Sequence, residues 1–404
     1  MGNRTILACL FVFCLAFPGA SQENRGLPQA VPEAIGLRPA QLSHIDDAVA
    51  AAIQARETPG AVVLVARHGK IGYWKAFAFR ALQPQTEAMT TDTIFDMASL
   101  TKVLATTPAI MLLAQNGRLR IGDKVKRYLP LFTGGGKDDI TVRQLLTHCS
   151  GLPADFDLSR PWEGREAALE ELWRLPVQTQ PGKEFLYSDL NFIALGEIVR
   201  AVSGESLDVF TQQEVYQPLG MSETGFKPPE SWLERIAPTE SRERSLQYLK
   251  GIAPASAPGM LRGEVHDPTA WRMGGVAGHA GLFSSARDVA IYAQMLLDHG
   301  NLRGSPLLSA STVQAMTSPQ SPGGLPVRGY GWDIDTAYSA PRGDLWAGGY
   351  GHTGFTGTSL WIHPPTETFI IILTNRLHPD GKGDVTHLRG VIANIVAAAI
   401  ADRD

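Results

Sequence analysis

Cysteine is scarce in this sequence, and its scarcity limits how the fold can be stabilised. Three cysteines occur among 404 residues, and two of them, Cys9 and Cys14, fall in an apolar run near the start of the chain. If that run is removed, Cys149 stands alone and no intramolecular disulfide can form. The fold must then depend on its hydrophobic core, which 44% apolar residues over this length can supply.

A strong charge excess and long apolar runs are lacking as well, which excludes two further classes of protein. The formal net charge is -4 and no basic block occurs, so no nucleic-acid partner is expected. After the first 25 residues, no stretch approaches the roughly 20 apolar residues of a membrane-spanning helix. We therefore expect no transmembrane domain in the mature protein.

The start of the chain has a different character. Arg4 precedes an apolar run at 6–17 and small residues at 18–21, a pattern typical of secretory signal peptides. We predict that residues 1–25 are a signal peptide and that the protein is secreted or periplasmic. A retained N-terminal membrane anchor, or a lipid on one of the two early cysteines, is the less favoured alternative.

Several familiar motifs are missing or incomplete. No Gly-x-Ser-x-Gly occurs, which removes the α/β-hydrolase explanation for an esterase. Residues 349–354 satisfy Gly-x-Gly-x-x-Gly, but a strand-like run follows where a dinucleotide site needs a helix. His266, Asp267 and His279 match no zinc spacing, so structural hydrogen bonding is the favoured interpretation of these three residues. We predict no cofactor and no metal.

The apolar periodicity predicts an α+β fold, because strand-like runs lie near both ends of the chain and helical patterns fill the middle. One antiparallel sheet flanked by helices would bury both sets of elements. The expected strands are 61–67, 72–78, 329–335, 357–363 and 368–375, and the expected helices are 40–57, 99–116, 141–147, 165–174, 189–202, 286–298 and 386–401.

This order of elements indicates a single catalytic domain over residues 26–404. Its sheet part is expected at about 35–98 and 325–404, with a mostly helical insertion at about 99–324. Residues 225–275 are rich in proline, glycine and serine and lack sustained periodicity. We interpret this segment as a long ordered excursion near the functional site.

Ser99 and Lys102 open one of the predicted helices. A spacing of three places both side chains on one helical face, so that the amine can reach the proton of the hydroxyl. The helix start also favours the negative charge that develops when a serine attacks a carbonyl. Taken alone, however, the pair is better explained as a helix N-cap followed by a solvated lysine.

Two later segments change this balance. Tyr187 directly precedes a predicted helix, where side chains commonly line a cleft. Residues 352–354 precede the expected strand 357–363, and their glycine would let a substrate approach the backbone closely. The N–H groups of Phe355 and Ser99 could then form an oxyanion hole.

The three segments together resemble a known signature. Ser-x-x-Lys at 99–102, Tyr-Ser-Asp at 187–189 and His-Thr-Gly at 352–354 occur in the order found in the serine β-lactamase-like superfamily. That superfamily includes class C β-lactamases, DD-peptidases and class VIII esterases. The resemblance implies a β-lactamase/transpeptidase-like fold over about residues 35–400.

Further segments support the resemblance. Residues 145–152 and 218–221 are similar to framework segments of the family. Residues 265–267 and 274–284 resemble a periplasmic subgroup that includes penicillin-binding protein 4B-like hydrolases.

The resemblance implies a role for each matching residue. Ser99 would be the nucleophile, Lys102 the partner that activates it and Tyr187 the proton shuttle. His352 and Thr353 would face the substrate, together with Gly354 and Phe355 beyond them.

Two charged residues bear on the substrate. Asp189 stands where many relatives have Asn, and a carboxylate cannot donate a hydrogen bond to a substrate carbonyl. Its charge should also raise the pKa of Lys102, which shifts proton abstraction towards Tyr187. Arg376 could attract a substrate carboxylate, a task for which His352 is less suited when neutral. A plain surface arginine is the slightly favoured interpretation of Arg376.

These residues predict an exported serine hydrolase that cleaves a carboxylic ester or related acyl bond through an acyl-Ser99 intermediate. D,D-peptidase, penicillin-binding or β-lactamase activity is the alternative. A catalytically silent binding protein is the third hypothesis, which the intact Ser99, Lys102 and Tyr187 disfavour. The expected partner is a small-molecule ester, a β-lactam or a peptidoglycan peptide, and the sequence predicts no oligomeric state.

Overall fold

The computed structural model describes residues 26–245, 259–302 and 304–401. The predicted signal peptide lies outside these residues. Among the helices of the described ranges, none is both long enough and apolar enough to cross a membrane.

Strands occur near both ends of the chain, with shorter ones between. They are β1 (Gly60–Arg67), β2 (Lys70–Ala81), β3 (Glu87–Ala88), β4 (Ile94–Asp96), β5 (Gly225–Phe226), β6 (Leu282–Ser285), β7 (Asn301–Leu302), β8 (Ser305–Pro306), β9 (Val327–Arg328), β10 (Asp333–Asp335), β11 (Tyr350–Thr353), β12 (Ser359–His363) and β13 (Thr368–Thr374).

Helices fill most of the chain between the outer strands and also flank them. The α-helices are α1 (Pro39–Leu42), α2 (His44–Gln54), α3 (Thr107–Gln115), α4 (Val142–Leu146), α5 (Arg165–Arg174), α6 (Asp189–Ser203), α7 (Leu207–Thr211), α8 (Gln217–Leu219), α9 (Arg242–Ser245), α10 (Pro268–Arg272), α11 (Ala286–Leu297), α12 (Ala310–Thr317) and α13 (Thr386–Ala399). Short 3₁₀ segments are η1 (Pro32–Ile35), η2 (Ala98–Leu100), η4 (Val125–Arg127), η6 (Glu230–Arg235), η7 (Ala340–Arg342) and η8 (Pro364–Thr366), and π-helical turns are η3 (Lys102–Thr106) and η5 (Gln212–Tyr216).

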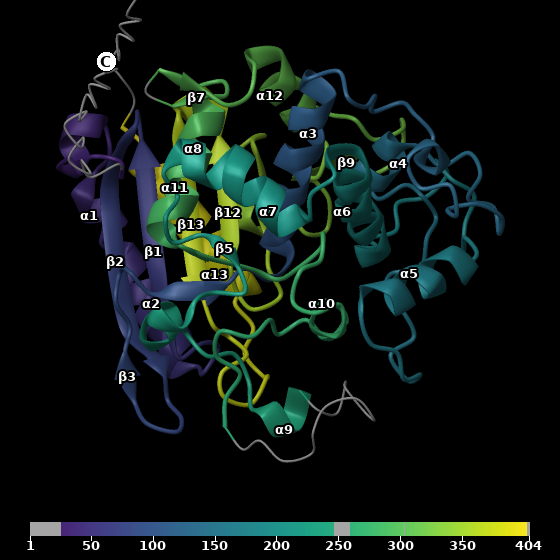
Figure 1. The fold of residues 1–404 in the computed structure, drawn as a ribbon. Helices are drawn as coiled ribbons and strands as arrows, with labels where there is room; N and C mark the ends of the chain where they lie inside the picture. The colour runs from purple at the N-terminus through teal and green to yellow at the C-terminus, as the bar shows by residue number, and fades with distance from the viewer. Residues whose placement is uncertain (1–25, 246–258, 303, 402–404) are drawn as a thin grey trace, which may run out of the picture.

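One large antiparallel sheet is assembled from the two ends of the chain. Its strand order is β3-β2-β1-β13-β12-β11-β10-β9. At its centre β1 pairs with β13, with Ala61 opposite Thr374 and Arg67 opposite Thr368. Figure 1 shows the purple N-terminal strands beside the yellow C-terminal ones. The predicted α+β class with an antiparallel sheet is confirmed.

The sheet is covered on both faces, and the alternation of side chains along β1 shows how. Val62 and Leu64 belong to the larger core, which the helices of the middle of the chain share. Val63 and Val65 point to the opposite face, where α2 and α13 supply the remaining apolar side chains. Because successive strand residues face opposite sides, a strand buried on both sides is apolar throughout.

A second, three-stranded sheet has the order β4-β6-β5 and carries the chain towards residue 99. In β4, Phe95 lies opposite Ser284 of β6. The segment before the first signature motif is therefore fixed by a strand pairing that the sequence did not predict.

The predicted helix at 99–116 is not regular. It consists of the 3₁₀ segment η2, the π-helical turn η3 and only then the α-helix α3. Every residue from 100 to 113 is buried, so apolar periodicity cannot distinguish these helix types. The extra residue of a π turn changes the direction of the side chains that follow it.

Near residue 350 one expected strand is shorter than predicted and one strand was missed. Of the expected strand 329–335, residues 333–335 form β10, because Gly331 turns with φ +78° and packs where a Cβ would lie 2.1 Å from Thr107 Oγ1. His352 and Thr353 precede the expected strand, which is β12, but they lie inside β11, which the sequence did not predict. The short, mixed sequence of β11 shows no clear alternation.

The excursion at 225–275 holds short elements rather than one long loop: β5, η6, α9 and α10. Residues 246–258 of it lie outside the described residues. Directly after this excursion the chain crosses α6 closely at Gly278. A Cβ on Gly278 would lie 1.9 Å from the carbonyl oxygen of Phe192.

This crossing gives a first prediction. Gly278→Ala should lower the free energy of unfolding by about 1–3 kcal/mol, because overpacking against backbone forces a shift of α6 or of its neighbour. Denaturant unfolding followed by circular dichroism measures it. Gly122→Ala is the matched control, because a Cβ on Gly122 would have no atom within 4 Å and its φ is not positive. Equal stability of the two variants would contradict the prediction.

Candidate active site

Ser99 follows a strained turn at the end of β4. Ala98 has a φ of +45°, which is unusual for a residue with a side chain. Asp96 holds this turn, since its Oδ1 accepts a hydrogen bond from the Ala98 N–H at 2.9 Å. The Thr356 hydroxyl in turn donates to the Asp96 carbonyl at 2.7 Å. The serine is therefore fixed from β4 and from the loop before β12.

Lys102 lies one turn after Ser99 and is fully buried. Its Nζ donates to Ser99 Oγ at 2.9 Å and to the His279 carbonyl at 3.2 Å. The same Nζ forms an ion pair with Asp189 Oδ1 at 2.6 Å. The structure thus brings the first and second signature motifs into direct contact.

Opposing effects act on the pKa of Lys102. Burial would lower this pKa, whereas the charge of Asp189 and then the Tyr187 phenol raise it. The net direction is upward, as the sequence led us to expect from Asp189. Lys102 is therefore an ammonium ion at neutral pH, and its charge is balanced by the Asp189 carboxylate.

Tyr187 precedes the N-cap of α6 and lies among aromatic and cationic groups. Its ring stacks on His148, with centroids 4.3 Å apart. Lys102 Nζ lies 5.0 Å from the ring centroid, and the Arg328 guanidinium lies 6.0 Å from it. Two cationic side chains therefore lie close to the Tyr187 ring.

His148 orients this aromatic group. It is buried, and its Nδ1 accepts a hydrogen bond from the Ser188 N–H at 3.1 Å. Burial, followed by the charges of Arg328 and Lys102, holds the pKa of His148 well below its usual range. A neutral imidazole therefore forms a flat wall behind Tyr187.

Strand β11 supplies the opposite wall of the site. Gly354 follows it directly, and a Cβ there would lie 2.1 Å from Thr358 Oγ1 and 2.6 Å from the Met97 carbonyl oxygen. Within the described ranges, the N–H groups of Ser99 and Phe355 donate no hydrogen bond. Both remain available for the oxyanion that we predicted they would bind.

His352 lies in β11 and is buried, with 4% of its surface exposed. Its Nδ1 donates to the carbonyl oxygen of Thr353 at 2.8 Å. Burial, and then the charges of Arg328 and Lys102, hold the pKa of His352 well below its usual range. The imidazole is neutral and presents its Nε2 as an acceptor.

Two cavities meet at Ser99 and Tyr187. The first, of about 530 Å³, we name the arginine lobe; it is lined by β11 and by cationic side chains, among them Arg328, Arg376, Lys382 and Arg389. The second, of about 470 Å³, we name the aspartate lobe; its lining includes Asp189, Asp267, Glu240, His266, Leu158 and Phe355.

Arg376 lines the arginine lobe but is partly committed to the backbone. Its Nε donates to the Phe355 carbonyl at 2.7 Å and its Nη1 to the Gly383 carbonyl at 2.5 Å. Its guanidinium also lies 4.5 Å from the centroid of the Phe355 ring. Arg376 therefore braces the loop after Gly354 as well as adding positive charge to the lobe.

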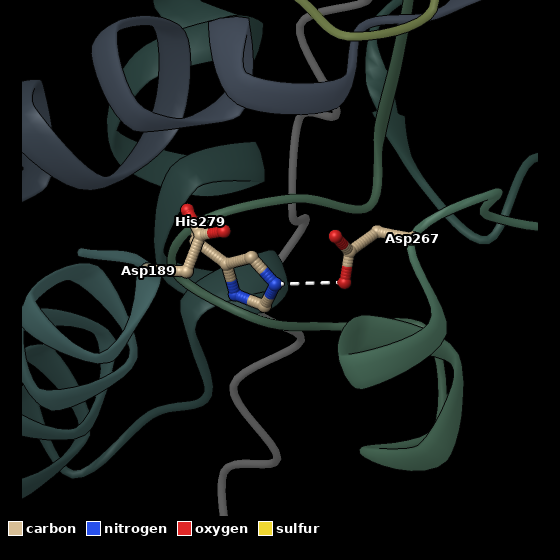
Figure 2. A group of neighbouring side chains, drawn as sticks. All are labelled: Asp189, Asp267 and His279. Atoms are coloured by element: carbon tan, nitrogen blue, oxygen red, sulfur yellow. Dashed lines mark hydrogen bonds and ion pairs between the residues drawn. The ribbon is translucent and has the colours of Figure 1, made fainter. Parts of the chain in front are cut away.

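Beside Lys102, the buried His279 forms an ion pair with the partly exposed Asp267. Figure 2 shows the imidazole of His279 between the carboxylates of Asp189 and Asp267. His279 Nε2 donates to Asp267 Oδ1 at 2.8 Å. Burial would lower the pKa of His279, but Asp267 and then Asp189 raise it, and the net direction is upward.

One ligand atom from each of Asp189, Asp267 and His279 lies within 4.8 Å of the others, a spacing that could surround a cation. The ammonium of Lys102 already occupies the position beside Asp189, and His279 already neutralises Asp267. Both carboxylates therefore already contact a nitrogen of the protein, without an ion between them. The absence of a metal, expected from the sequence, stays a prediction that these contacts support.

His266 has a separate structural setting. Its backbone N–H donates to Asp96 Oδ2 at 2.7 Å, and its Nε2 contacts Glu240 Oε1 at 2.8 Å. Its ring stacks on Phe355, with centroids 5.9 Å apart. His266 therefore links the turn before Ser99 to the loop after β11.

Comparison with known proteins gives the family. The sequence profile of the family described as Beta-lactamase matches residues 45–393, most of the chain. The chain belongs to the beta-lactamase family. The resemblance inferred from the three motifs is confirmed at this level, and hydrolysis is the activity the family shares.

Two relatives in this family are similar over most of their length. A Bacillus subtilis (strain 168) protein named N-acetylmuramyl-L-alanine amidase is 36% identical over 353 residues, covering 79% of this chain and 78% of the relative. An Escherichia coli (strain K12) protein named as a D-alanyl-D-alanine carboxypeptidase is 31% identical over 382 residues, covering 87% and 86%.

Solved structures share the fold of this beta-lactamase family member. EstCE1, a hydrolase with promiscuous acyltransferase activity, has a TM-score of 0.69 at 23% identity and covers 89% of this chain and 99% of its own. A penicillin-binding protein homologue from Caulobacter crescentus has a TM-score of 0.68 at 21% identity and covers 90% and 99%. At these identities the likeness establishes the fold alone.

Sequence reasoning missed several residues around the site. Arg328 and Arg389 are buried cations of the arginine lobe, and no motif marked them. His148 lies within a quoted framework segment, but its contact with Tyr187 was not foreseen. Asp155 follows that segment, and nothing in the sequence connected it with Asp267.

Asp155 is a largely buried carboxyl next to the cluster. Both of its oxygens accept from the Thr269 hydroxyl, at 3.0 and 2.9 Å. Burial, and then the charges of Asp267 and Asp189, raise the pKa of Asp155 to about 7. In an unfolded chain an Asp has a pKa near 3.9, so folding disfavours the charged form.

This raised pKa gives a prediction for stability. Between pH 5 and pH 8 the folded protein has to ionise Asp155, and the free energy of unfolding should fall as it does so. Asp155→Asn should therefore stabilise the protein more at pH 8 than at pH 5, by on the order of 1–2 kcal/mol. Thermal or denaturant unfolding at the two pH values measures this.

Asp157→Asn is the matched control from the same loop, because Asp157 is exposed and its pKa is lowered rather than raised. It should show no extra stabilisation at pH 8. If Asp155→Asn has the same effect at both pH values, Asp155 is not the buried acid described above.

Proposed function

We propose that the protein is a serine hydrolase in which the Ser99 hydroxyl forms a covalent acyl intermediate. The 2.9 Å contact between Ser99 Oγ and the buried Lys102 Nζ, at the meeting point of two cavities, carries this proposal. A solvated first-turn lysine would not be fully buried. The contact also argues against a silent binding protein, because it serves no evident purpose other than chemistry.

The proposed reaction has two halves. Ser99 Oγ attacks the substrate carbonyl carbon while its proton passes to the deprotonated oxygen of Tyr187, and the N–H groups of Ser99 and Phe355 receive the oxyanion. Tyr187 then gives the proton to the leaving nitrogen or oxygen, and the bond to the acyl carbon breaks. Water attacks the acyl group and loses a proton to Tyr187, which returns this proton to Ser99 Oγ as the bond between Oγ and the acyl carbon breaks and the acid leaves.

In this scheme Lys102 stays charged. Its ammonium group stabilises the deprotonated Tyr187 and orients Ser99, and Asp189 keeps the lysine protonated. Arg328 adds positive charge 6.0 Å from the centroid of the same ring. The proposed role of Lys102 is therefore electrostatic. Lys102 does not act as a neutral amine base in this scheme.

We propose an amide bond of a cell-wall peptide as the substrate. The two curated relatives are named for amide-cleaving activities on cell-wall material. The cationic side chains of the arginine lobe suit the carboxylates that such peptides carry. This favours the peptidase alternative over the ester that the sequence first suggested, although the same site would also cleave activated esters. Export of the chain before it acts is part of the proposal.

The first test removes single groups. Ser99→Ala should abolish turnover, and Lys102→Ala and Tyr187→Phe should each lower kcat by about 10²–10⁴-fold, because each group acts on the transition state. Steady-state kinetics and circular dichroism measure activity and folding. Tyr128→Phe, at a tyrosine bound to Asp123 away from the cleft, is the matched control and should keep wild-type rates. Wild-type-like kcat in Tyr187→Phe would remove Tyr187 from the mechanism.

A second test addresses the substrate. Peptide amides with a free carboxylate in the leaving group should have kcat/KM at least tenfold above the same peptides blocked as C-terminal amides, because the arginine lobe would lose an ionic contact. Product release followed by mass spectrometry measures both. Equal values for free and blocked peptides, with rapid turnover of short nitrophenyl esters, would instead favour the ester hydrolase.

A further inference from the structure

Asp189 occupies an unusual position for a carboxylate, beside the nucleophile. Its Oδ1 is held by the Lys102 ammonium at 2.6 Å, and 23% of its side chain is exposed. Its Oδ2 accepts no hydrogen bond from any residue the structure describes. Because Asp189 lines the aspartate lobe, Oδ2 is the oxygen left to face a bound substrate.

Asp267 offers a second open oxygen in the same lobe. Its Oδ1 accepts from His279 Nε2 and from the Ala270 N–H, both at 2.8 Å. No donor from the described part of the chain reaches its Oδ2, and 24% of the side chain is exposed. Ligand atoms of the two carboxylates lie within 4.8 Å of each other.

The two lobes hold different parts of the substrate. Tyr187, which protonates the leaving group in our scheme, lines both lobes, but the arginine lobe places three side chains around its ring: Arg328 at 6.0 Å, Tyr338 at 5.2 Å and His352 at 6.1 Å from the ring centroid. The leaving group therefore belongs in the arginine lobe. The acyl group, on the other side of the carbonyl, belongs in the aspartate lobe.

We infer that Asp189, assisted by Asp267, selects substrates whose acyl group carries a hydrogen-bond donor next to the scissile carbonyl, either an ammonium or a hydroxyl group. An ionised carboxylate only accepts hydrogen bonds. A donor placed against the carboxylate gains a charge-assisted hydrogen bond. A methyl group would displace water from the carboxylate without replacing its hydrogen bonds, and a carbonyl oxygen would be repelled by the negative charge. This inference rests on the proposed function and adds the chemical class of the acyl group.

The other charges of the lobe do not supply this donor. His279 is bound to Asp267, and Glu240 is bound to Arg244 Nε at 3.0 Å and to His266 Nε2 at 2.8 Å. Lys102 faces Asp189 through Oδ1. The Oδ2 atoms of Asp189 and Asp267 are thus the acceptors that remain available for a donor on the substrate.

The test uses four p-nitroanilides that differ in one substituent of the acyl group: alanyl, lactyl, isobutyryl and N-acetylalanyl. Ammonium, hydroxyl and methyl are similar in size, so the first three isolate the donor. For the wild type we expect kcat/KM for the better of alanyl and lactyl to exceed that for isobutyryl by about 10–100-fold. Values within twofold would overturn the inference.

The alanyl and lactyl compounds distinguish the two donors. If an ammonium is preferred, the advantage of alanyl should disappear as the pH rises through the pKa of its amine. If a hydroxyl is preferred, the advantage of lactyl should not depend on that ionisation. Either result supports the inference that Asp189 selects acyl groups that carry a hydrogen-bond donor.

Asp189→Asn changes the acceptor into a group that also donates. The N-acetylalanyl compound keeps an N–H next to the scissile carbonyl and adds an acetyl carbonyl, which the amide of Asn can bind as a donor and a carboxylate cannot. The ratio of kcat/KM for N-acetylalanyl to that for lactyl should therefore rise at least tenfold in this variant. Because both values come from the same variant, a general loss of reactivity through Lys102 cancels. Asp155→Asn is the matched control, a carboxylate-to-amide change in the same cluster that does not line the lobe, and its ratio should stay at the wild-type value. An unchanged ratio in Asp189→Asn would overturn the inference.

Labelling of Ser99 by a fluorophosphonate separates the two levels of the proposal. If Ser99 is not labelled and no anilide is cleaved, the proposed function fails and the inference fails with it. If Ser99 is labelled and all four anilides are cleaved equally well, only the inference fails. Where turnover is too slow to follow, the concentration of each anilide that slows labelling ranks the acyl groups instead.

Discussion

The ion pair between Lys102 and Asp189 is the interaction on which the site depends. An ammonium group without a partner could not be buried at this depth, because the loss of hydration would force it to release its proton. Asp189, the first residue of α6, balances the charge of Lys102. In the neighbouring pair, Asp267 and His279 partner each other. A fully buried cation thereby lies 2.9 Å from a serine hydroxyl. The surrounding fold brings three distant segments together closely enough for this to happen.

Much of the fold could be predicted from the sequence, and so could the grouping of three residues of the candidate site. The long apolar runs of β1 and β13 are unambiguous, and α5 begins and ends where its pattern predicts. The three motifs named Ser99, Lys102 and Tyr187, which the structure brings together. Failures occurred where burial hides periodicity, as in the π turn after Ser99, or where a strand is too short to alternate, as in β11.

Other features could not be predicted because they arise only from tertiary contacts. The pKa of Asp155 rises to about 7 because the carboxyl is buried and lies near Asp267 and Asp189. Arg328 is buried beside Tyr187 although no motif marks it in the sequence. Asp189 was recognised as a departure from the family pattern, but its open oxygen becomes visible only once the aspartate lobe is defined. In each case the local sequence identifies the side chain, but its burial, its contacts and its pKa depend on segments that are distant in the sequence.

The pairing of β1 with β13 also constrains when the molecule can fold. Residues near position 60 find their central partner only after residues near position 374 have left the ribosome, because these strands pair directly. Such contacts, remote in sequence, require closure of a very long loop and form slowly. Throughout synthesis the hydrophobic β1 therefore has only β2 beside it, and its other edge remains open to chaperones or to other chains. The cleft at Ser99, which needs both ends of the chain, is accordingly assembled last.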